Sequence, residues 1–316
     1  MMCLPLFQAK SSSDRLLISI SGIPGSGKTT LASLVCTRLN QLYHSYSQSL
    51  HPNTPDSPPI SPDICVSLPL DGYHLTRSEL SSLPHPEEAH YRRGAPFTFN
   101  GNGFLSLVES LRSPILPETR TIRAPSFSHS IKDPIENDIP IPPSARIVII
   151  EGLYLTLDLK PWNSAASLFD ESWFISVPIE TASERLIKRH VKAGIAPDEA
   201  YARKRVGESD MRNAREILDH LHPNISETIE STEDDNWKPK THDQAEALEE
   251  EKTDHHLLPP PRSENTTSTD HTNQNNEIKN QSPSTRPGPP SRNPTTTLTT
   301  GSIDSLRELA ENGGGC

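Results

Sequence analysis

A short glycine-rich stretch near the start of the chain constrains the fold more than any other feature. Residues 22–29 read G-x-x-x-x-G-K-T. A β-prone apolar run at 15–21 precedes the stretch, and a segment with apolar residues at helical spacing, 30–39, follows it. This order of strand, loop and helix is the context in which the pattern binds phosphate. The alternative interpretation is a chance glycine turn between a strand and a helix.

Each residue type in this stretch suits the binding of a triphosphate. Backbone N–H groups from a glycine-rich loop can surround phosphate oxygens, because glycine permits the conformations and the close approach that this needs. Lys28 is predicted to place its charge at the β- and γ-phosphates, and the Thr29 hydroxyl to bind Mg²⁺. The predicted nucleotide-binding residues of the loop are Gly22, Pro24, Gly25, Ser26, Gly27, Lys28, Thr29 and Thr30.

Composition divides the chain into a folded part and a polar tail. Of the 316 residues, 32% are hydrophobic, 5% are aromatic and 31 residues are prolines, which is too polar for a core that spans the whole chain. We expect a flexible N-terminus at 1–13, one α/β domain at 14–238 and a disordered acidic, Pro/Ser/Thr-rich tail at 239–316. A Pro/Ser-rich surface insertion is expected at 44–63. A short amphipathic helix at 302–311 would be a weak partner-binding segment or nothing.

Charge, cysteines and hydropathy exclude several classes of function. The net charge is −11, most of it carried by an acidic stretch at 226–254, so a footprint for nucleic acid is absent. The four cysteines lack metal-binding spacing, which is typical of thiols in a reducing compartment. The sequence has no apolar run near the ~18 residues of a membrane span, and its start is a poor signal peptide. We therefore expect a cytoplasmic protein that binds neither nucleic acid nor membrane.

Two acidic residues directly follow predicted buried strands. Asp71 comes after the apolar run 64–70, and Glu151 comes after the run 145–150. In open parallel sheets, ligands bind beyond the carboxyl ends of the strands, so both acids are expected near the glycine-rich loop. Glu151 could bind Mg²⁺ through water or position the acceptor. The alternatives are that Asp71 caps the next helix and that Glu151 is a lone strand-end carboxylate.

Arginines gather in two other segments. Arg92 and Arg93 lie in a polar loop at 85–100 and indicate an anionic substrate or a transition-state clamp, or else a solvated pair in surface ion pairs. Helices are predicted at 181–192 and 198–220, joined by a Gly/Pro break and rich in arginine. They resemble a lid that closes over a triphosphate and excludes water. The alternative is a solvent-facing helical hairpin.

The remaining elements complete an alternating α/β pattern. A helix is predicted at 101–112, a strand end at 121–125, and further strands at 172–177 and 225–229. Between them we expect a proline-punctuated loop that carries His129 and Asp133. A histidine at such a place is more often structural than catalytic.

Several motifs taken together resemble one family. They are GIPGSGKTT, LDGYH, AHYRRGAPFTF, SFSH followed by KDP, IVIIEGLYL and RLIKRHVKAGI, and they cover about 14–237. The combination resembles an uncharacterised group of fungal and bacterial ATP-dependent kinases, related to uridine kinase, phosphoribulokinase and bacterial-type pantothenate kinase. The resemblance implies a P-loop NTPase fold: a mostly parallel sheet with helices on both faces and a helical lid at 181–220. It also implies phosphorylation of a hydroxyl on a small metabolite, with ATP and Mg²⁺ as cofactors.

The resemblance also implies roles for individual residues. Asp71 would accept the proton of the substrate hydroxyl, and Glu151 would lie near Mg²⁺, with Thr29 as the other metal ligand. Arg185 and Arg189 would be lid cations that bind the nucleotide. The predicted substrate-binding residues are His74, Arg92, Arg93 and His129, and the predicted catalytic residues are Lys28, Asp71 and Glu151.

Three positions depart from the pattern of that family. Asn100, Ser128 and Ser209 stand where we expect other polar residues, mostly acids, so substrate or activity could differ if those positions contact substrate. They motivate an alternative function, a catalytically weak nucleotide-binding scaffold whose tail recruits partners. A GTPase-type switch is disfavoured, because the chain has no N-K-x-D motif and DGYH does not fit a switch sequence. The acceptor could be a nucleoside, a sugar or a vitamin precursor, and the arginines favour an anionic one.

Overall fold

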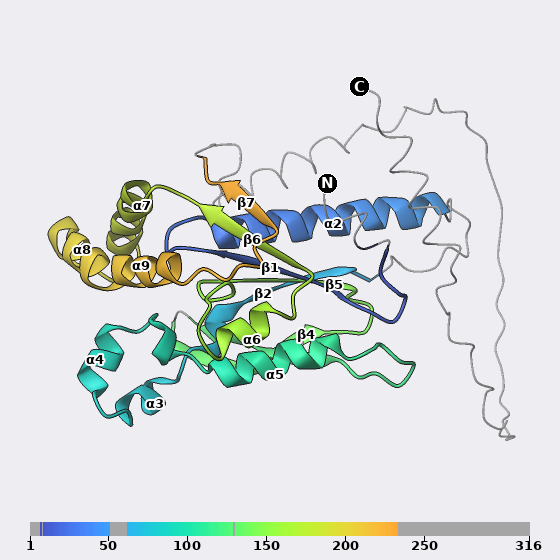
Figure 1. Ribbon diagram of the computed structural model, residues 1–316, viewed down its shortest axis with the longest axis horizontal. Helices are drawn as coiled ribbons and strands as arrows, with labels where there is room; N and C mark the ends of the chain where they lie inside the picture. Colours follow the sequence, from blue (N-terminus) through green and yellow to red (C-terminus); the bar gives the residue numbers. More distant parts are fainter. Residues whose placement is uncertain (1–6, 8, 51–61, 129, 233–316) are drawn as a thin grey trace, which may run out of the picture. The chain divides into compact units, whose positions relative to one another are not determined.

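A five-stranded parallel sheet forms the centre of the part of the chain that the computed structural model describes, which comprises residues 7, 9–50, 62–128 and 130–232 (Figure 1). All of these residues belong to one compact unit of the chain. The sheet has the order β2-β5-β1-β6-β7, and every neighbouring pair is parallel. Its strands are β1 (Leu16–Gly22), β2 (Cys65–Pro69), β5 (Ile147–Gly152), β6 (Glu171–Ser176) and β7 (Glu227–Glu230).

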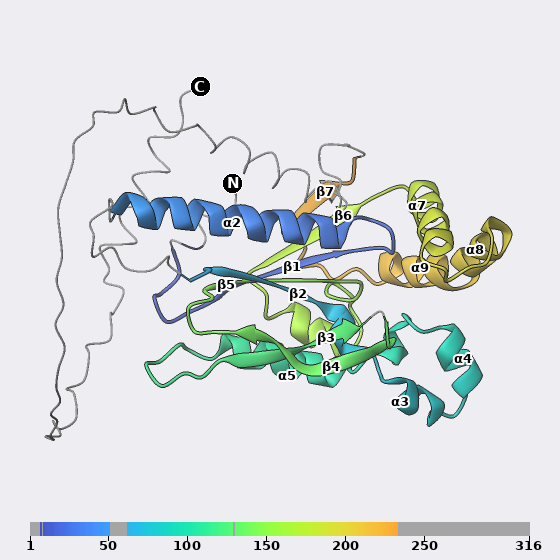
Figure 2. The same cartoon turned by 180° about the vertical axis from the view of Figure 1, so that it is seen from behind.

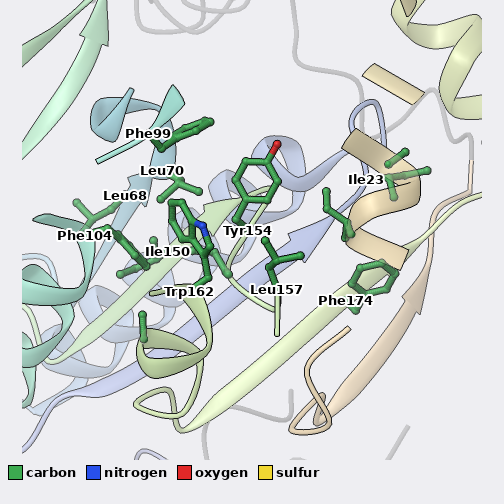
Figure 3. Packing of buried hydrophobic residues seen from close by; sticks show 14 of the residues in the cluster. Ile23, Leu68, Leu70, Phe99, Phe104, Ile150, Tyr154, Leu157, Trp162 and Phe174 are labelled. Atoms are coloured by element: carbon green, nitrogen blue, oxygen red, sulfur yellow. The ribbon is translucent and has the colours of Figure 1, made fainter. Parts of the chain in front are cut away.

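Helices cover both faces of this sheet, as the sequence predicts. Side chains of β1 alternate between two apolar clusters: Ile18 packs with Ala32 and Leu39 of α2 (Lys28–Leu50), whereas Leu17 faces the other cluster. That second cluster includes Phe104 from α5 (Gly101–Arg112) and residues of α6 (Trp162–Ala166), and Figure 3 shows part of it. Figures 1 and 2 place α2 on one side of the sheet and α5 and α6 on the other. The doubly covered P-loop fold is therefore confirmed.

The helix after the glycine-rich loop is longer than the sequence predicts. It continues to Leu50, into the stretch 44–63 that was expected to be a surface insertion. Tyr46 is only 7% exposed, so this last part of the helix still packs against the domain. The first proline of the stretch is Pro52, and a helix can continue until a proline removes an N–H donor. Residues 51–61 lie outside the described part of the chain.

The loop expected around Asp133 is instead a strand, so that prediction is wrong. β3 (Ile122–Ser128) and β4 (Asp133–Ile141) form a separate antiparallel pair, with Phe127 opposite Pro134. Prolines are tolerated there because each strand of a two-stranded ribbon has one edge without a partner. The predicted substrate-binding residue His129 lies outside the described residues.

The predicted lid is a set of helices at one end of the sheet. It consists of α7 (Ile179–Lys192), α8 (Glu199–Arg205), the π-helical turn η3 (Val206–Asp210) and α9 (Met211–Asp219). The single helix expected at 198–220 is thus interrupted by η3. The same end of the sheet carries η1 (Leu70–Tyr73), α3 (Arg77–Ser81), α4 (Pro86–Tyr91) and η2 (Pro96–Thr98) (Figures 1 and 2).

Two sequence predictions concern segments at the ends of the chain. The tail at 239–316, with its helix at 302–311, lies outside the described residues, as does most of 1–13. Within the described part of the chain, every helix is too short or too polar to traverse a lipid bilayer.

Candidate active site

The glycine-rich loop connects the end of β1 to the first turn of α2. Gly25 and Gly27 have φ values of 80° and 97°, which side chains with a Cβ rarely adopt. A Cβ on Gly25 would lie 2.7 Å from the Ala182 carbonyl oxygen of α7. The loop therefore needs glycine both for its backbone conformation and for the close approach of α7.

Lys28 folds back over this loop. Its Nζ donates to the Ile23 carbonyl oxygen at 2.9 Å and lies 3.4 Å from Ser26 Oγ. Burial lowers the pKa of Lys28 to about 8; the charges of Glu151 and Asp71 oppose this shift, and that of Arg189 adds to it. A buried ammonium with a lowered pKa gains most from the arrival of a polyanion such as a triphosphate.

Glu151 joins the first turn of α2 to the end of β5. Thr29 Oγ1 donates to Glu151 Oε1 at 3.0 Å. Glu151 is 8% exposed, and its burial raises its pKa; the charge of Lys28 opposes that shift and the charge of Asp71 adds to it. Lys28 and Glu151 thus act on each other's pKa, and the charge of Asp71 acts on both, at the carboxyl ends of β1, β2 and β5.

The donor set of this cluster fits a magnesium–nucleotide complex. Mg²⁺ in kinase sites is held by one or two protein oxygens together with phosphates and waters. Thr29 and Glu151 supply two such oxygens side by side. Within the described residues, no group of three or more His, Cys, Asp or Glu side chains is arranged so that it could hold a metal ion. The cluster therefore suits a metal that arrives with a triphosphate.

Asp71 lies in η1, immediately after β2, with its side chain 51% exposed. The helix that follows, α3, is capped by Thr76, whose hydroxyl accepts from the Glu79 N–H while the Glu79 carboxylate accepts from the Thr76 N–H. Asp71 is thus not used as the cap of α3, and its carboxylate stays accessible beside the Lys28 and Glu151 charges.

His74 directly follows η1 and contacts two aromatic rings. Its ring centroid lies 3.9 Å from that of Phe99 and 5.0 Å from that of Phe127, and its Nδ1 is 2.8 Å from the Asp71 carbonyl oxygen. His74 thus connects the turn that carries Asp71 to β3.

Asn100, one of the departures from the family pattern, accepts a hydrogen bond from the Gly103 N–H and caps α5.

Arg93 connects the segment after α4 to the β3–β4 pair. Its NH2 donates to the Leu75 carbonyl oxygen at 2.7 Å and to Asp133 Oδ1 at 3.0 Å, and its guanidinium lies 5.3 Å from the centre of the Phe127 ring. NH1 donates to the Lys132 carbonyl oxygen. Arg93 is therefore paired with an acid of the β3–β4 ribbon.

Arg92 has a different environment from its neighbour. It is 4% exposed, its NH2 donates to Asn213 Oδ1 at 2.7 Å, and its Nε has no hydrogen-bond partner among the residues that the structure describes. Burial lowers its pKa, as does the nearby charge of Arg212. The two adjacent arginines are thus held separately, rather than as a solvated surface pair.

The predicted lid cations both lie on α7, next to the glycine-rich loop. Arg185 NH1 donates to Ser231 Oγ at 2.9 Å and lies 3.4 Å from the Gly25 carbonyl oxygen. Arg189 is exposed, and its charge lowers the pKa of Lys28. Positive charge therefore converges on the loop from two elements, as an anionic ligand requires.

Sequence reasoning missed two residues that hold this end of the domain together. Asn213 is 2% exposed and bonds both Arg92 and Gly94, and Tyr154 is fully buried and donates its hydroxyl to the Gly94 carbonyl oxygen. Asn213 lies in a strongly charged helix and Tyr154 in an apolar run, so neither stands out in the sequence.

The glycine-rich loop, the doubly covered parallel sheet and the strand-end acids define a P-loop protein of the kinase type. No family model matches the chain. A protein of Aspergillus versicolor named ATP-dependent kinase-like protein notR' is 47% identical over 174 residues, which are 55% of this chain and 98% of that protein. A protein of Schizosaccharomyces pombe named "putative uridine kinase" is 35% identical over 200 residues, which are 63% of this chain and 77% of that protein.

A solved structure supports the same assignment. The structure of YFH7 from Saccharomyces cerevisiae, described as "a putative P-loop containing kinase with a circular permutation", matches with a TM-score of 0.64 at 25% identity. The match covers 73% of this chain and 97% of that one. The chain therefore belongs to the family of ATP-dependent kinase-like P-loop proteins that these relatives represent.

Proposed function

We propose that this protein is a small-molecule kinase that transfers the γ-phosphate of ATP to a hydroxyl group in the presence of Mg²⁺. The observation that carries the proposal is the cluster of Lys28, Asp71 and Glu151, whose charges influence one another at the carboxyl edge of the sheet. A cation, a buried acid beside a hydroxyl and an accessible acid are the groups that phosphoryl transfer to an alcohol needs.

The nucleotide would be held by the glycine-rich loop and its surroundings. Bound Mg-ATP supplies the transferred phosphoryl group, with its charge partly neutralised by the metal. The N–H groups of the loop and the Lys28 ammonium would bind phosphate oxygens, while Thr29 and Glu151 would hold the metal. Arg185 and Arg189 would add positive charge from α7, where charge develops in the transition state.

Asp71 would orient the acceptor hydroxyl and take its proton. Its accessibility supports this role, because the group must meet a ligand that enters from solvent. The buried Glu151, which is bonded to Thr29, is less suited to it. Catalysis would come mainly from positioning and from electrostatic stabilisation.

The acceptor would be a small metabolite of the nucleoside, sugar or vitamin-precursor class. A cavity of about 340 Å³ lies beside His74, between η1, α5 and the β3–β4 pair, and is within the size range of metabolite pockets. Its lining includes Arg123 and Glu136. The relative named as a uridine kinase supports a nucleoside. An anionic acceptor has support from Arg92 rather than from Arg93, whose charge is paired with Asp133.

The proposal is tested by a thermal-shift screen of metabolites with a non-hydrolysable ATP analogue and Mg²⁺, followed by ADP release from ATP with each hit. We expect the analogue to raise the melting temperature, and one acceptor to raise it further and to support turnover. Asp71→Asn should reduce turnover by about 10²-fold or more while the analogue still binds. Near-normal turnover in Asp71→Asn would exclude Asp71 as the base.

The screen also separates the kinase from the scaffold alternative. Mg-ATP binding without ADP release across a panel of nucleosides, sugars and vitamin precursors would favour a scaffold. Absence of any nucleotide-dependent shift would contradict both. We also infer a cytoplasmic location, because the four cysteines of the sequence lack metal-binding spacing, which is typical of thiols in a reducing compartment.

A further inference from the structure

We propose that Asn213 is a positioning residue that transmits nucleotide binding from the lid to the acceptor loop, defined as residues 92–95 between α4 and η2. The inference rests on the proposed function and deepens it, because it assigns a role at the same site to a residue that does not touch the reacting groups. Asn213 lies in α9 and is 2% exposed.

Both polar atoms of the Asn213 amide bind the acceptor loop. Oδ1 accepts from Arg92 NH2 at 2.7 Å, and Nδ2 donates to the Gly94 carbonyl oxygen at 3.1 Å. A buried amide that is bonded at both ends fixes the orientation of its partners, because loss of either bond would leave a buried polar group unsatisfied. α9 and the acceptor loop are therefore held in one relative position.

The Gly94 carbonyl oxygen accepts a second hydrogen bond, from a residue that follows the strand β5. The buried Tyr154 follows β5 and packs in the core with Trp162 and Leu157 (Figure 3), and its hydroxyl donates to the same Gly94 carbonyl oxygen. Gly94 has a φ of 110°, which favours glycine. Gly94 of the acceptor loop is thus attached both to the core and to α9.

A second group of contacts joins the same two regions. The Tyr91 hydroxyl at the end of α4 donates to Glu208 Oε2 in η3, and the Arg205 guanidinium lies 5.7 Å from the centre of the Tyr91 ring. Tyr91 thus contacts the end of α8 and η3, whereas Asn213 lies on α9. A π-helical turn widens a helix locally and often marks a functional site, which suits a segment that must adjust when the lid moves.

The other end of the lid contacts the nucleotide loop. Arg185 of α7 lies within hydrogen-bond distance of the Gly25 carbonyl oxygen. The α7 residue Leu186 and the lid residues Ala202 and Ala214 belong to one buried cluster, so α7, α8 and α9 are packed together. A continuous set of contacts therefore leads from the phosphate loop through the lid to Asn213 and the acceptor loop.

Hydrogen exchange of the whole protein tests this coupling without knowledge of the acceptor. A non-hydrolysable ATP analogue with Mg²⁺ should slow amide exchange in 22–30, and also in 92–99, by on the order of fivefold or more. In Asn213→Ala, protection of 22–30 should persist while nucleotide-dependent protection of 92–99 is lost. Asn213→Asp should behave like Asn213→Ala, because it keeps an acceptor for Arg92 but places a carboxylate against the Gly94 carbonyl.

Two further variants separate coupling from simple loss of structure. Tyr154→Phe removes the core-side bond to Gly94, so 92–99 should exchange faster in both states but still respond to nucleotide. Asn40→Ala is the matched control, since Asn40 makes a comparable two-bond bridge, from α2 to Cys65 of β2. It should reduce stability without changing the response of 92–99.

The possible results are distinguishable. A wild-type response at 92–99 in Asn213→Ala, or a protected 22–30 with an unresponsive 92–99 in the wild type, would overturn the coupling alone. Lack of protection at 22–30 in the wild type would overturn the proposed function and the coupling with it. If Asn213→Ala does not fold, Asn213→Asp against Tyr154→Phe gives the same comparison.

Discussion

The nucleotide end and the acceptor end of the site are built in different ways. At the nucleotide end, Lys28 bonds Ile23 five residues away, and its loop takes its shape from its own glycines. At the acceptor end, Arg93 bonds Asp133, 40 residues away, and Arg92 bonds Asn213, 121 residues away. The phosphate loop of the first end is specified by a contiguous sequence, whereas the second end is assembled from distant segments.

This difference separates the two halves of the proposed reaction. The phosphate loop keeps its shape as long as the strand–loop–helix unit folds, because its conformation is set by its own glycines. The acceptor end depends on side-chain bonds between elements, so single substitutions there can reposition a loop without affecting the P-loop. Substrate identity is therefore expected to vary at the acceptor end.

The largest predicted effect comes from Lys28→Ala. It should abolish nucleotide-induced stabilisation, which for the wild type at a hundredfold excess over Kd is about 2.7 kcal/mol, and should reduce turnover by about 10²-fold or more. Differential scanning fluorimetry with and without Mg-ATP measures the first effect. Asp133→Asn, at the acceptor end, should keep the full nucleotide-induced shift.

Lys28→Ala should also melt at or slightly above the wild type when nucleotide is absent. The pKa of Lys28 is lowered in the folded state, so its charged form is disfavoured there, and below pH 8 the folded protein bears an unfavourable contribution that the variant lacks. A variant that melts well below the wild type would show that Lys28 is needed for the fold, and would remove the contrast between the two ends.

A pair of glycine substitutions sharpens the comparison. Gly25→Ala has both an unfavourable φ and a Cβ 2.7 Å from the Ala182 carbonyl oxygen, so it should weaken nucleotide binding by roughly 10–10²-fold. Gly94→Ala has an unfavourable φ, but its Cβ would make only an ordinary contact of 3.9 Å with Asn213 Nδ2, so it should lower stability by ~1–3 kcal/mol and leave nucleotide affinity near normal.

Isothermal titration with Mg-ATP and urea unfolding of both variants measure these two quantities. Equal losses of nucleotide affinity in Gly25→Ala and Gly94→Ala would mean that nucleotide binding depends on the acceptor loop as strongly as on the glycines of the phosphate loop.

A smaller effect is expected at the link between Arg93 and Asp133. The side chains are 15% and 29% exposed, so the ion pair is partly screened and should contribute on the order of 1 kcal/mol to stability. A double-mutant cycle with Arg93→Ala and Asp133→Asn, followed by urea unfolding, measures it. Coupling near zero would mean that the β3–β4 pair is held to the acceptor end by other contacts, such as that of Phe127 with His74.

The nucleotide end could be predicted from the sequence because its determinants are local. The pattern at 22–29, the flanking apolar runs and the strand-end positions of Asp71 and Glu151 are each visible without tertiary information. The parallel sheet followed from its continuously apolar strands. The structure brings the two acids close enough for their charges to raise the pKa of Lys28. This agrees with the rule that ligand-binding groups gather beyond the carboxyl ends of parallel strands.

The acceptor end could not be predicted in the same way. Prolines in β4 indicated a loop, because sequence rules cannot tell that a two-stranded ribbon leaves each strand with a free edge. Arg92 and Arg93 look equivalent in sequence, yet one bonds an amide on α9 and the other an acid on β4. Asn213 has no local signature at all, since its partners are fixed only by the folded arrangement of α9.

The smallest effect predicted is a proton uptake that belongs to the nucleotide end alone. The pKa of Lys28 is lowered to about 8 without nucleotide, and bound phosphates should raise it well above that value. Binding of Mg-ATP should then take up about 0.1 proton at pH 7 and close to one proton at pH 9.

Isothermal titration in buffers of different ionisation enthalpy measures this uptake. Two lid groups have shifted pKa values: the buried His190 has a pKa of about 4, and the partly buried Asp210 has a pKa of about 6. Both titrate below pH 7 and so contribute little at pH 9. Asp133→Asn should show the same uptake as the wild type, because the acceptor end holds no group of this kind near Lys28. A buffer-independent enthalpy at pH 9 would mean that Lys28 is already fully charged before nucleotide binds, and that its burial is offset by Glu151 and Asp71 alone.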